Sequence, residues 1–277
     1  MTLCDKNFKE VANRILSEGA NTKGEKVRPK YADGTPSHTY FVNQVFERYD
    51  ISKGELPILT IRPVAWKSGI KEILWIYQDQ SNELSVLKEK YNIHWWDDWN
   101  IGDGTIGQRY GATVKRHDLM NKLLNGLKKQ PYGRRHIINL FQEDDLIETP
   151  GLYPCAMETQ WAVRDGYLDM TLIQRSSDLP VANAINKIQY VALMIMVARH
   201  VGLKPGVFCH YVNNAHIYDR HIDQIKVLLE RDEQEDGENI KLALNPDKTD
   251  FYSFTIDDFK LENYNPKKPN LKFELAI

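Results

Sequence analysis

Three stretches of the sequence hold residue types that could act together on one substrate. Cys155 follows a Pro-Gly turn and precedes a run with strand-like alternation. Gln174 to Asp178 (QRSSD) carries an arginine, two hydroxyls and a carboxylate, and His216 to Tyr218 (HIY) adds an imidazole and a phenol. A thiolate is a nucleophile, and arginine binds phosphate through parallel N–H donors. Together these residue types would suit nucleophilic chemistry on a small ligand.

The position of Cys155 alone favours packing over catalysis, because a free cysteine usually acts as a small buried hydrophobe. Residues 155–163, the turn 164–166 and residues 167–175 together predict a β-hairpin with Cys155 at its head. The period of two predicts a strand face made of Cys155, Met157, Thr159, Trp161 and Val163.

The composition favours a globular protein without a broad nucleic-acid surface. The chain has 277 residues, 42% of them hydrophobic, which suffices for a sizeable core. A net charge of −2 gives no overall basic field, so we expect no duplex DNA partner. A ligand that needs only a few local arginines remains open. The glycine spacings match neither GxGxxG nor a phosphate-binding GxxxxGK[ST] loop.

The three cysteines and eight histidines predict a reducing compartment and no metal site. An odd, sparse cysteine count without CxxC argues against disulfides, and the histidines form no HExxH motif. The first residues lack the apolar run of a signal peptide. The longest apolar run, 190–198, is much shorter than the about 20 residues that span a bilayer. We therefore expect a cytoplasmic protein with no membrane partner.

Helix-like and strand-like periodicities intermix without regular βαβ alternation, which predicts an α+β fold. We expect one domain, residues 1–277, with a mixed or antiparallel sheet flanked by helices. The predicted helices are 8–16, 70–77, 83–91, 120–127, 183–199 and 216–230, and the predicted strands are 39–49, 56–61, 137–141, 155–163, 167–175 and 207–212. Residues 20–38 read as a long loop, functional or mobile, and 230–238 as an acidic surface loop.

Several further polar or aromatic residues could face a ligand or serve the fold. Glu72 lies beside an apolar helical stripe, where it would be solvated unless that face lines a cavity. Trp96 belongs to a tryptophan cluster that is either core or the wall of a site stacking a planar ligand. Asn186 lies in a buried helix and needs hydrogen-bond partners from the protein or a ligand.

The arginines outside the QRSSD motif are ambiguous. Arg28 is the one arginine of the 20–38 loop, and its position alone favours an ordinary solvated surface charge. Arg134 and Arg135 begin a predicted strand, where adjacent side chains point to opposite faces. Both could bind one anion only if the strand ends or bends there.

These motifs occur in the order and with the spacing of the thymidylate synthase family, which the sequence resembles from about Glu72 to its end. Each motif is weak alone, and the joint order is highly specific. The resemblance rests on Trp96-Asp97-Asp98-Trp99, Tyr110-Gly111, Arg134-Arg135, Pro154-Cys155, Gln174 to Asp178, Asn186, His216-Ile217-Tyr218 and Ala276-Ile277. It implies a homodimer whose sheets pack together and which converts dUMP to dTMP. The implied carbon and hydride donor is 5,10-methylenetetrahydrofolate.

The resemblance also implies residue roles. Cys155 would add to C6 of uracil, and the Asn186 amide would bind O4 and N3–H, whereas an aspartate there would favour cytosine. Glu72 would organise water and proton transfer, and Tyr110 would lie near the C5 proton. The implied dUMP-binding residues are Arg28, Arg175, Ser176, Ser177, Asp178, Asn186, His216 and Tyr218, with Arg134 and Arg135 from the other subunit. The implied folate-binding residues are Trp96, Asp178 and Ala276.

The sequence departs from the family pattern near the folate site. Ala156 stands where a histidine usually follows the nucleophile, Ala65 replaces another frequent histidine, and 179–185 lacks the usual Gly, Pro and Phe pattern. These departures suggest a divergent branch, such as a phage-related one. Two alternatives stay open: a pyrimidine nucleotide hydroxymethylase on the same scaffold, and a non-catalytic protein that binds nucleotides or RNA.

Overall fold

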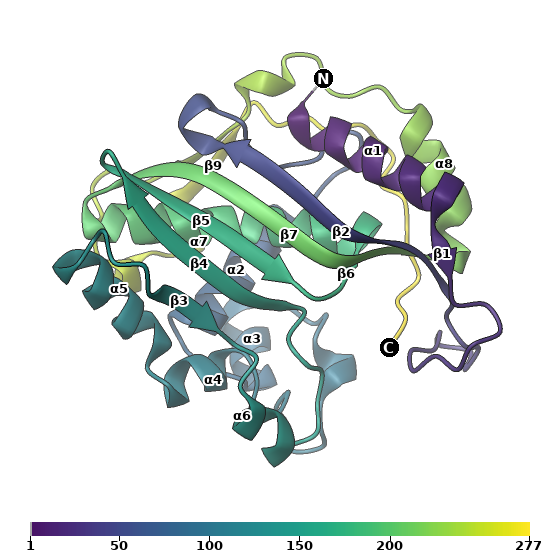
Figure 1. The fold of residues 1–277 in the computed structure, drawn as a ribbon, viewed down its shortest axis with the longest axis horizontal. Coiled ribbons are helices and arrows are strands. Elements are labelled where there is room, and N and C mark those ends of the chain that lie inside the picture. The colour runs from purple at the N-terminus through teal and green to yellow at the C-terminus, as the bar shows by residue number, and fades with distance from the viewer. Residues whose placement is uncertain (1) are drawn as a thin grey trace.

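The computed structural model describes residues 2–277, and it has a mixed sheet backed by helices (Figure 1). The sheet order is β1-β2-β7-β5-β4-β3, with β6 also pairing β7. Its strands are β1 (Ala20–Asn21), β2 (Thr39–Asp50), β3 (His136–Asn139), β4 (Ala156–Arg164), β5 (Tyr167–Gln174), β6 (Ser177–Asp178) and β7 (Lys204–Tyr218). Strands β5 and β6 run parallel to β7, and the other pairs are antiparallel. The predicted α+β fold with a mixed sheet is confirmed.

Helices and a small two-stranded sheet complete the architecture of residues 2–277. The helices are α1 (Leu3–Glu18), α2 (Trp66–Tyr77), α3 (Leu84–Tyr91), α4 (Gly111–Arg116), α5 (Leu119–Lys129), α6 (Glu143–Glu148), α7 (Ala184–Val201) and α8 (Ile222–Glu230). Strands β8 (Lys241–Leu244) and β9 (Phe259–Glu262) form a separate pair. The helical stretch Leu179–Val201 is long and apolar enough to cross a membrane, but 78% of its most apolar window is buried, as in a core helix.

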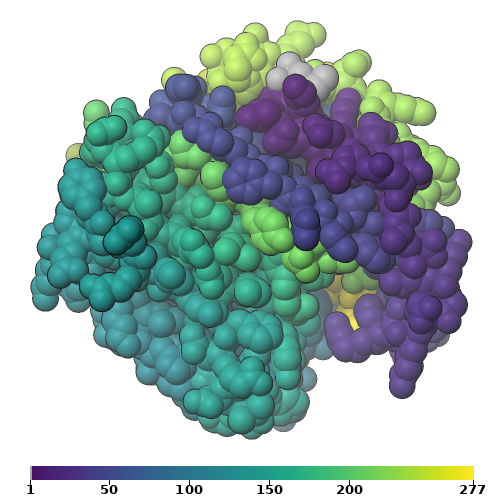
Figure 2. Space-filling view, viewed as in Figure 1, coloured from purple at the N-terminus to yellow at the C-terminus, as the bar shows by residue number. Residues whose placement is uncertain are grey.

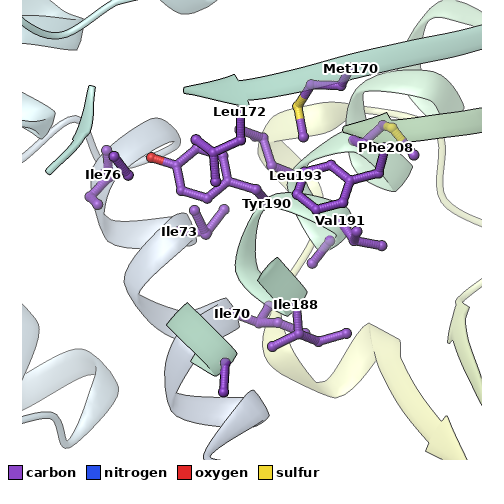
Figure 3. Close-up of a cluster of buried hydrophobic side chains, with 14 of the residues drawn as sticks. Ile70, Ile73, Ile76, Met170, Leu172, Ile188, Tyr190, Val191, Leu193 and Phe208 are labelled. Carbon is purple, nitrogen blue, oxygen red and sulfur yellow. The ribbon is translucent and has the colours of Figure 1, made fainter. Parts of the chain in front are cut away.

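The core lies between the sheet and helices α2 and α7. Helix α7 is buried on nearly every side, because apolar residues occupy most of its positions. Figure 3 shows side chains from α2 (Ile70, Ile73 and Ile76) facing those from α7 (Ile188, Val191 and Leu193) beneath β5 and β7. This packing fixes α2 and α7 against each other, and both helices carry candidate site residues.

The opposite face of the sheet exposes apolar side chains. Phe46 on β2 is 60% exposed and Ile137 on β3 is 47% exposed. Glu47 and Ile138, their neighbours in the two strands, are buried on the helix-covered face. A sheet face with large exposed apolar groups is typical of an interaction surface.

Three sequence-based expectations are wrong. Residues 56–61 form no strand, because Ile58 and Leu59 are buried in an irregular segment whose Thr60 N–H donates to Asp5 Oδ1 at 2.8 Å. The 216–230 segment begins as strand, since β7 runs to Tyr218 and helix α8 starts only at Ile222. Residues 56–61 resemble a strand in sequence because they include buried β-branched residues. The start of 216–230 resembles a helix in sequence because an amphipathic helix follows the HIY motif directly.

The third error concerns the face of β4. A register shift lies between Ala156, which pairs Gln174, and Glu158, which pairs Ile173. Because a bulge changes the alternation, buried Ala156 shares the helix-facing side with Thr159 and Trp161. Cys155 therefore does not belong to the predicted face, and it lies just before the strand begins.

Candidate active site

A cavity of about 590 Å³ is lined by residues just before Cys155 and by Arg175. Its lining comes from distant parts of the chain: Arg28, Trp99, Asn100, Ile101, Phe141, Gly151, Leu152, Tyr153 and Arg175. Figure 2 shows a hollow between the purple N-terminal region and the teal region around residue 150, with yellow atoms of the C-terminal segment visible inside it. Two of the predicted phosphate arginines, Arg28 and Arg175, thus face one cavity.

Cys155 is held by backbone contacts on both sides. Its N–H donates to the Tyr110 hydroxyl at 3.2 Å, and its carbonyl accepts from the Arg175 N–H at 3.1 Å. The Arg175 side chain is anchored by the carbonyls of Tyr153 (2.7 Å) and Pro154 (3.0 Å). Its Nη2 lies 3.6 Å from the Cys155 sulfur. The predicted pairing of the hairpin strands beside Cys155 is therefore confirmed.

Two opposing effects act on the pKa of the Cys155 thiol. Burial is the larger effect and raises the pKa of Cys155, while Arg175 and Arg28 act in the opposite direction. The two arginines therefore limit the increase in the pKa of Cys155 that burial causes. They supply the positive field that a thiolate nucleophile requires.

Tyr110 has a backbone conformation that non-glycine residues rarely adopt, with φ of 47° and ψ of −107° at the start of α4. Its ring packs against Trp96 with centroids 5.2 Å apart. This geometry aims the hydroxyl at Cys155. Strained residues cluster at functional sites, which makes Tyr110 a functional candidate on structural grounds as well.

The Asn186 side chain is oriented by two glutamines. Its Oδ1 accepts from Gln174 Nε2 at 3.1 Å, and its Nδ2 donates to Gln189 Oε1 at 2.7 Å. Each amide group can make a second hydrogen bond at its oxygen and at its nitrogen. Asn186 therefore retains one donor and one acceptor for a ligand.

Glu72 projects from α2 toward the same group of side chains. Its two oxygens accept from Trp96 Nε1 and from Gln189 Nε2, both at 2.8 Å. Burial raises the pKa of Glu72 to about 7, and these hydrogen bonds oppose the rise. A carboxyl group that titrates near neutrality can take up and release protons during a reaction.

Strand β6 brings QRSSD and HIY together, because it pairs parallel to β7 with Asp178 opposite His216. Burial lowers the pKa of His216 to about 4, so the ring is neutral at pH 7, and it lies 5.2 Å from the Tyr218 ring. Burial raises the pKa of Asp178 to about 7. Ser177 Oγ and Asp178 Oδ1 are buried without a hydrogen-bond partner among residues 2–277, so ligand atoms could satisfy them.

The end of the chain pairs with the Arg28 loop. Lys30 and Ile277 exchange backbone hydrogen bonds of 2.7 and 2.9 Å, and Ala276 is buried. The 20–38 segment is irregular as predicted, apart from β1 and an isolated bridge between Lys30 and Pro36. The tail and the loop therefore form one edge of the site.

The remaining predicted residues are placed less directly. Ser176 lies between Arg175 and β6 and is half-buried. Arg134 and Arg135 are exposed before β3, and neither lines the cavity that Arg28 and Arg175 share. Sequence analysis missed the link from Gln189 to Glu72, although the i, i+3 spacing of Asn186 and Gln189 on one helix was a signal for their contact.

Comparisons with known proteins all point to one family. A family model described as "Thymidylate synthase" matches residues 6–277. Thymidylate synthases from Streptococcus pneumoniae (strain 70585) and Streptococcus sanguinis (strain SK36) are 53% and 50% identical, each over 100% of both chains. The structure of the thermostable thymidylate synthase A from Bacillus subtilis matches with a TM-score of 0.92 and 39% identity, covering 99% of each chain. The chain belongs to the thymidylate synthase family.

Proposed function

We propose that the protein is a methyltransferase that converts dUMP to dTMP with 5,10-methylenetetrahydrofolate, which leaves as dihydrofolate. Family membership over residues 6–277 supports the reaction. The observation that carries it in the structure is the Cys155 sulfur 3.6 Å from an anchored arginine beside a cavity. The predicted phage-related origin stays a prediction.

Covalent catalysis explains the residues around Cys155. The thiolate adds to C6 of uracil, and the electron pair moves through C5 onto O4. C5 then attacks the methylene carbon of the folate, which breaks the bond from that carbon to N10. The proton on C5 leaves and the bond to N5 breaks, which gives the exocyclic methylene group. Hydride transfer from the folate to the exocyclic methylene group expels the thiolate and gives dTMP. Asn186 would stabilise the charge on O4, and Glu72 and Tyr110 would assist the proton transfers.

The phosphate and sugar of dUMP would be bound at the arginine-lined end of the site. Arg28, Arg175 and Ser176 would contact the phosphate, and Ser177, Asp178, His216 and Tyr218 would line the nucleoside. Arg134 and Arg135 would reach the phosphate from a second subunit. The exposed apolar face bearing Phe46 and Ile137 supports a sheet-to-sheet homodimer, in which those two arginines lie near the interface.

Folate would bind between the tryptophan cluster and the tail. Trp96, Asp178 and Ala276 are the proposed contacts, and docking of the tail would exclude water from the reactive methylene intermediate. We also infer a cytoplasmic location, because Cys4, Cys155 and Cys209 are all free thiols.

Two measurements test this function. A rise in dihydrofolate absorbance with dUMP and methylenetetrahydrofolate is expected, and its absence would contradict the proposal. Release of tetrahydrofolate instead would indicate the hydroxymethylase, in which water quenches the intermediate. Mass spectrometry with 5-fluoro-dUMP and the folate should detect a covalent complex that Cys155→Ser abolishes. A non-catalytic nucleotide- or RNA-binding protein would form none.

A further inference from the structure

One line of hydrogen bonds runs from the sheet to α2 and passes through the Asn186 side chain. It runs from His210 Nε2 to Gln174 Oε1 (2.5 Å), from Gln174 Nε2 to Asn186 Oδ1 (3.1 Å), from Asn186 Nδ2 to Gln189 Oε1 (2.7 Å) and from Gln189 Nε2 to Glu72 Oε2 (2.8 Å). Every donor in the line points toward Glu72. Hydrogen bonds with a common direction polarise and strengthen one another.

The ionised Glu72 carboxylate sets that direction, because it can only accept hydrogen bonds. Gln189 must then turn its NH₂ group toward Glu72 and its oxygen toward Asn186. The Asn186 amide must in turn present its NH₂ group to Gln189 and its oxygen to Gln174. Without Gln189, nothing in this line would transmit the orientation from Glu72 to Asn186.

We propose that Gln189 is a positioning residue for base selection: it fixes the Asn186 amide so that its free donor and acceptor match O4 and N3–H of uracil. This inference rests on the proposed function and extends it to the uracil-over-cytosine preference. Cytosine presents an amino group and an unprotonated nitrogen in these places, so it would require the reverse orientation of the amide.

The packing around Gln189 supports its role in orienting Asn186. The side chain is 2% exposed, so both ends of its amide need partners, which are Asn186 and Glu72. On α2, a Cβ added at Gly69 would lie 2.8 Å from Gln189 Cγ. The absence of a side chain at Gly69 therefore lets α2 approach closely enough for Glu72 to reach Gln189.

The first test is base selectivity, measured as the dissociation constants of dUMP and dCMP at pH 8, where Glu72 is largely ionised. Gln189→Met keeps the side-chain length and removes both hydrogen bonds. We expect the preference for dUMP to fall by about ten-fold. Glu72→Gln should lower it too, since an amide can donate or accept and no longer imposes a direction. Gln224→Met on α8 is the matched control and should leave the preference unchanged.

The second test uses no substrate, so it is independent of the reaction. Trp96 donates to Glu72, and a pH titration of tryptophan fluorescence should include a transition that Glu72→Gln removes. In Gln189→Met, Glu72 loses the hydrogen bond that Gln189 donates. The midpoint of the fluorescence transition should therefore rise by about one pH unit. An unchanged midpoint, or unchanged selectivity in both Gln189→Met and Glu72→Gln, would overturn the proposal. Absence of dihydrofolate formation by the wild type would instead contradict the proposed function and leave this titration as a valid test.

Discussion

Arg175 Nη2 lies 3.6 Å from the Cys155 sulfur while the same nitrogen donates to the Tyr153 carbonyl at 2.7 Å. The positive charge is therefore fixed beside the thiol by the backbone of the segment that carries it. A fixed cation stabilises the thiolate without having to reorganise when the thiol ionises. This arrangement opposes the rise in the pKa of Cys155 that burial causes.

Removing that cation should make Cys155 less reactive at neutral pH. We expect Arg175→Met to raise the pKa of the thiol and to slow its alkylation by iodoacetamide at pH 7 by about ten-fold. Peptide mass spectrometry over a pH series identifies the alkylated residue. The variant Cys155→Ser shows how much of the alkylation comes from Cys4 and Cys209. Equal alkylation rates in wild type and Arg175→Met would show that the guanidinium does not activate the thiol.

The contact between Cys155 and Arg175 was predictable, because a hairpin with a short turn fixes which residues lie opposite. The contact between Asp178 and His216 was not, because it depends on parallel pairing of β6 with β7 after the long helix α7. Local pattern could not reveal the bulge at the start of β4 either. Bulges follow from the packing of the whole sheet, and strand periodicity alone does not encode them.

Glu72 should make stability depend on pH. The pKa of Glu72 rises from 4.5 to about 7 on folding. The favourable contribution of Glu72 to the free energy of unfolding is therefore complete below pH 4.5 and is lost as the pH rises through 7. The free energy of unfolding should therefore fall between pH 5 and pH 8 more in wild type than in Glu72→Gln, by at most roughly 3 kcal/mol. Urea unfolding at one protein concentration measures this. Parallel pH profiles would contradict the assigned pKa.

Lys187 and Glu47 form a buried ion pair that ties α7 to β2, with Nζ 2.8 Å from Oε2. The attraction lowers the pKa of Glu47 despite its burial. Lys187→Met should cost about 3–5 kcal/mol of unfolding free energy, because it leaves a carboxylate buried without its cation. The double variant Lys187→Met/Glu47→Gln should recover most of that loss. If the double variant is as unstable as the single one, lost packing explains the effect.

A shared site predicts complementation between inactive subunits. Cys155→Ser should lack activity through the nucleophile, and Arg134→Ala/Arg135→Ala should lose dUMP affinity through the arginines donated to the partner. Unfolding and refolding the two variants together should produce heterodimers in which one of the two sites is intact. We expect up to about one quarter of wild-type activity in the mixture, measured as dihydrofolate formation. Activity no higher than that of the separate variants would argue that each subunit holds a complete site.

Arg220 joins the tail to the Arg28 loop. Its guanidinium lies 2.8 Å from Asp33 in the loop and 3.1 Å from Glu274 in the tail, and it also covers the Tyr31 ring at 4.0 Å. The neighbouring His221 ring contacts the Glu274 carbonyl through Nε2 at 2.8 Å. The site's edge thus depends partly on ion pairs that solvent can reach.

Breaking this link should loosen the tail without unfolding the protein. Exposed ion pairs contribute about 0.2–1 kcal/mol each, so Arg220→Met should raise the KM for the folate by a few-fold and speed removal of Ile277 by carboxypeptidase. High salt should reproduce part of the effect in wild type, because it screens exposed charges. Lys226→Met, which removes an exposed cation paired with Asp223 on α8, is the matched control. Equal carboxypeptidase rates in wild type and Arg220→Met would mean that the Lys30–Ile277 pairing alone holds the tail in place.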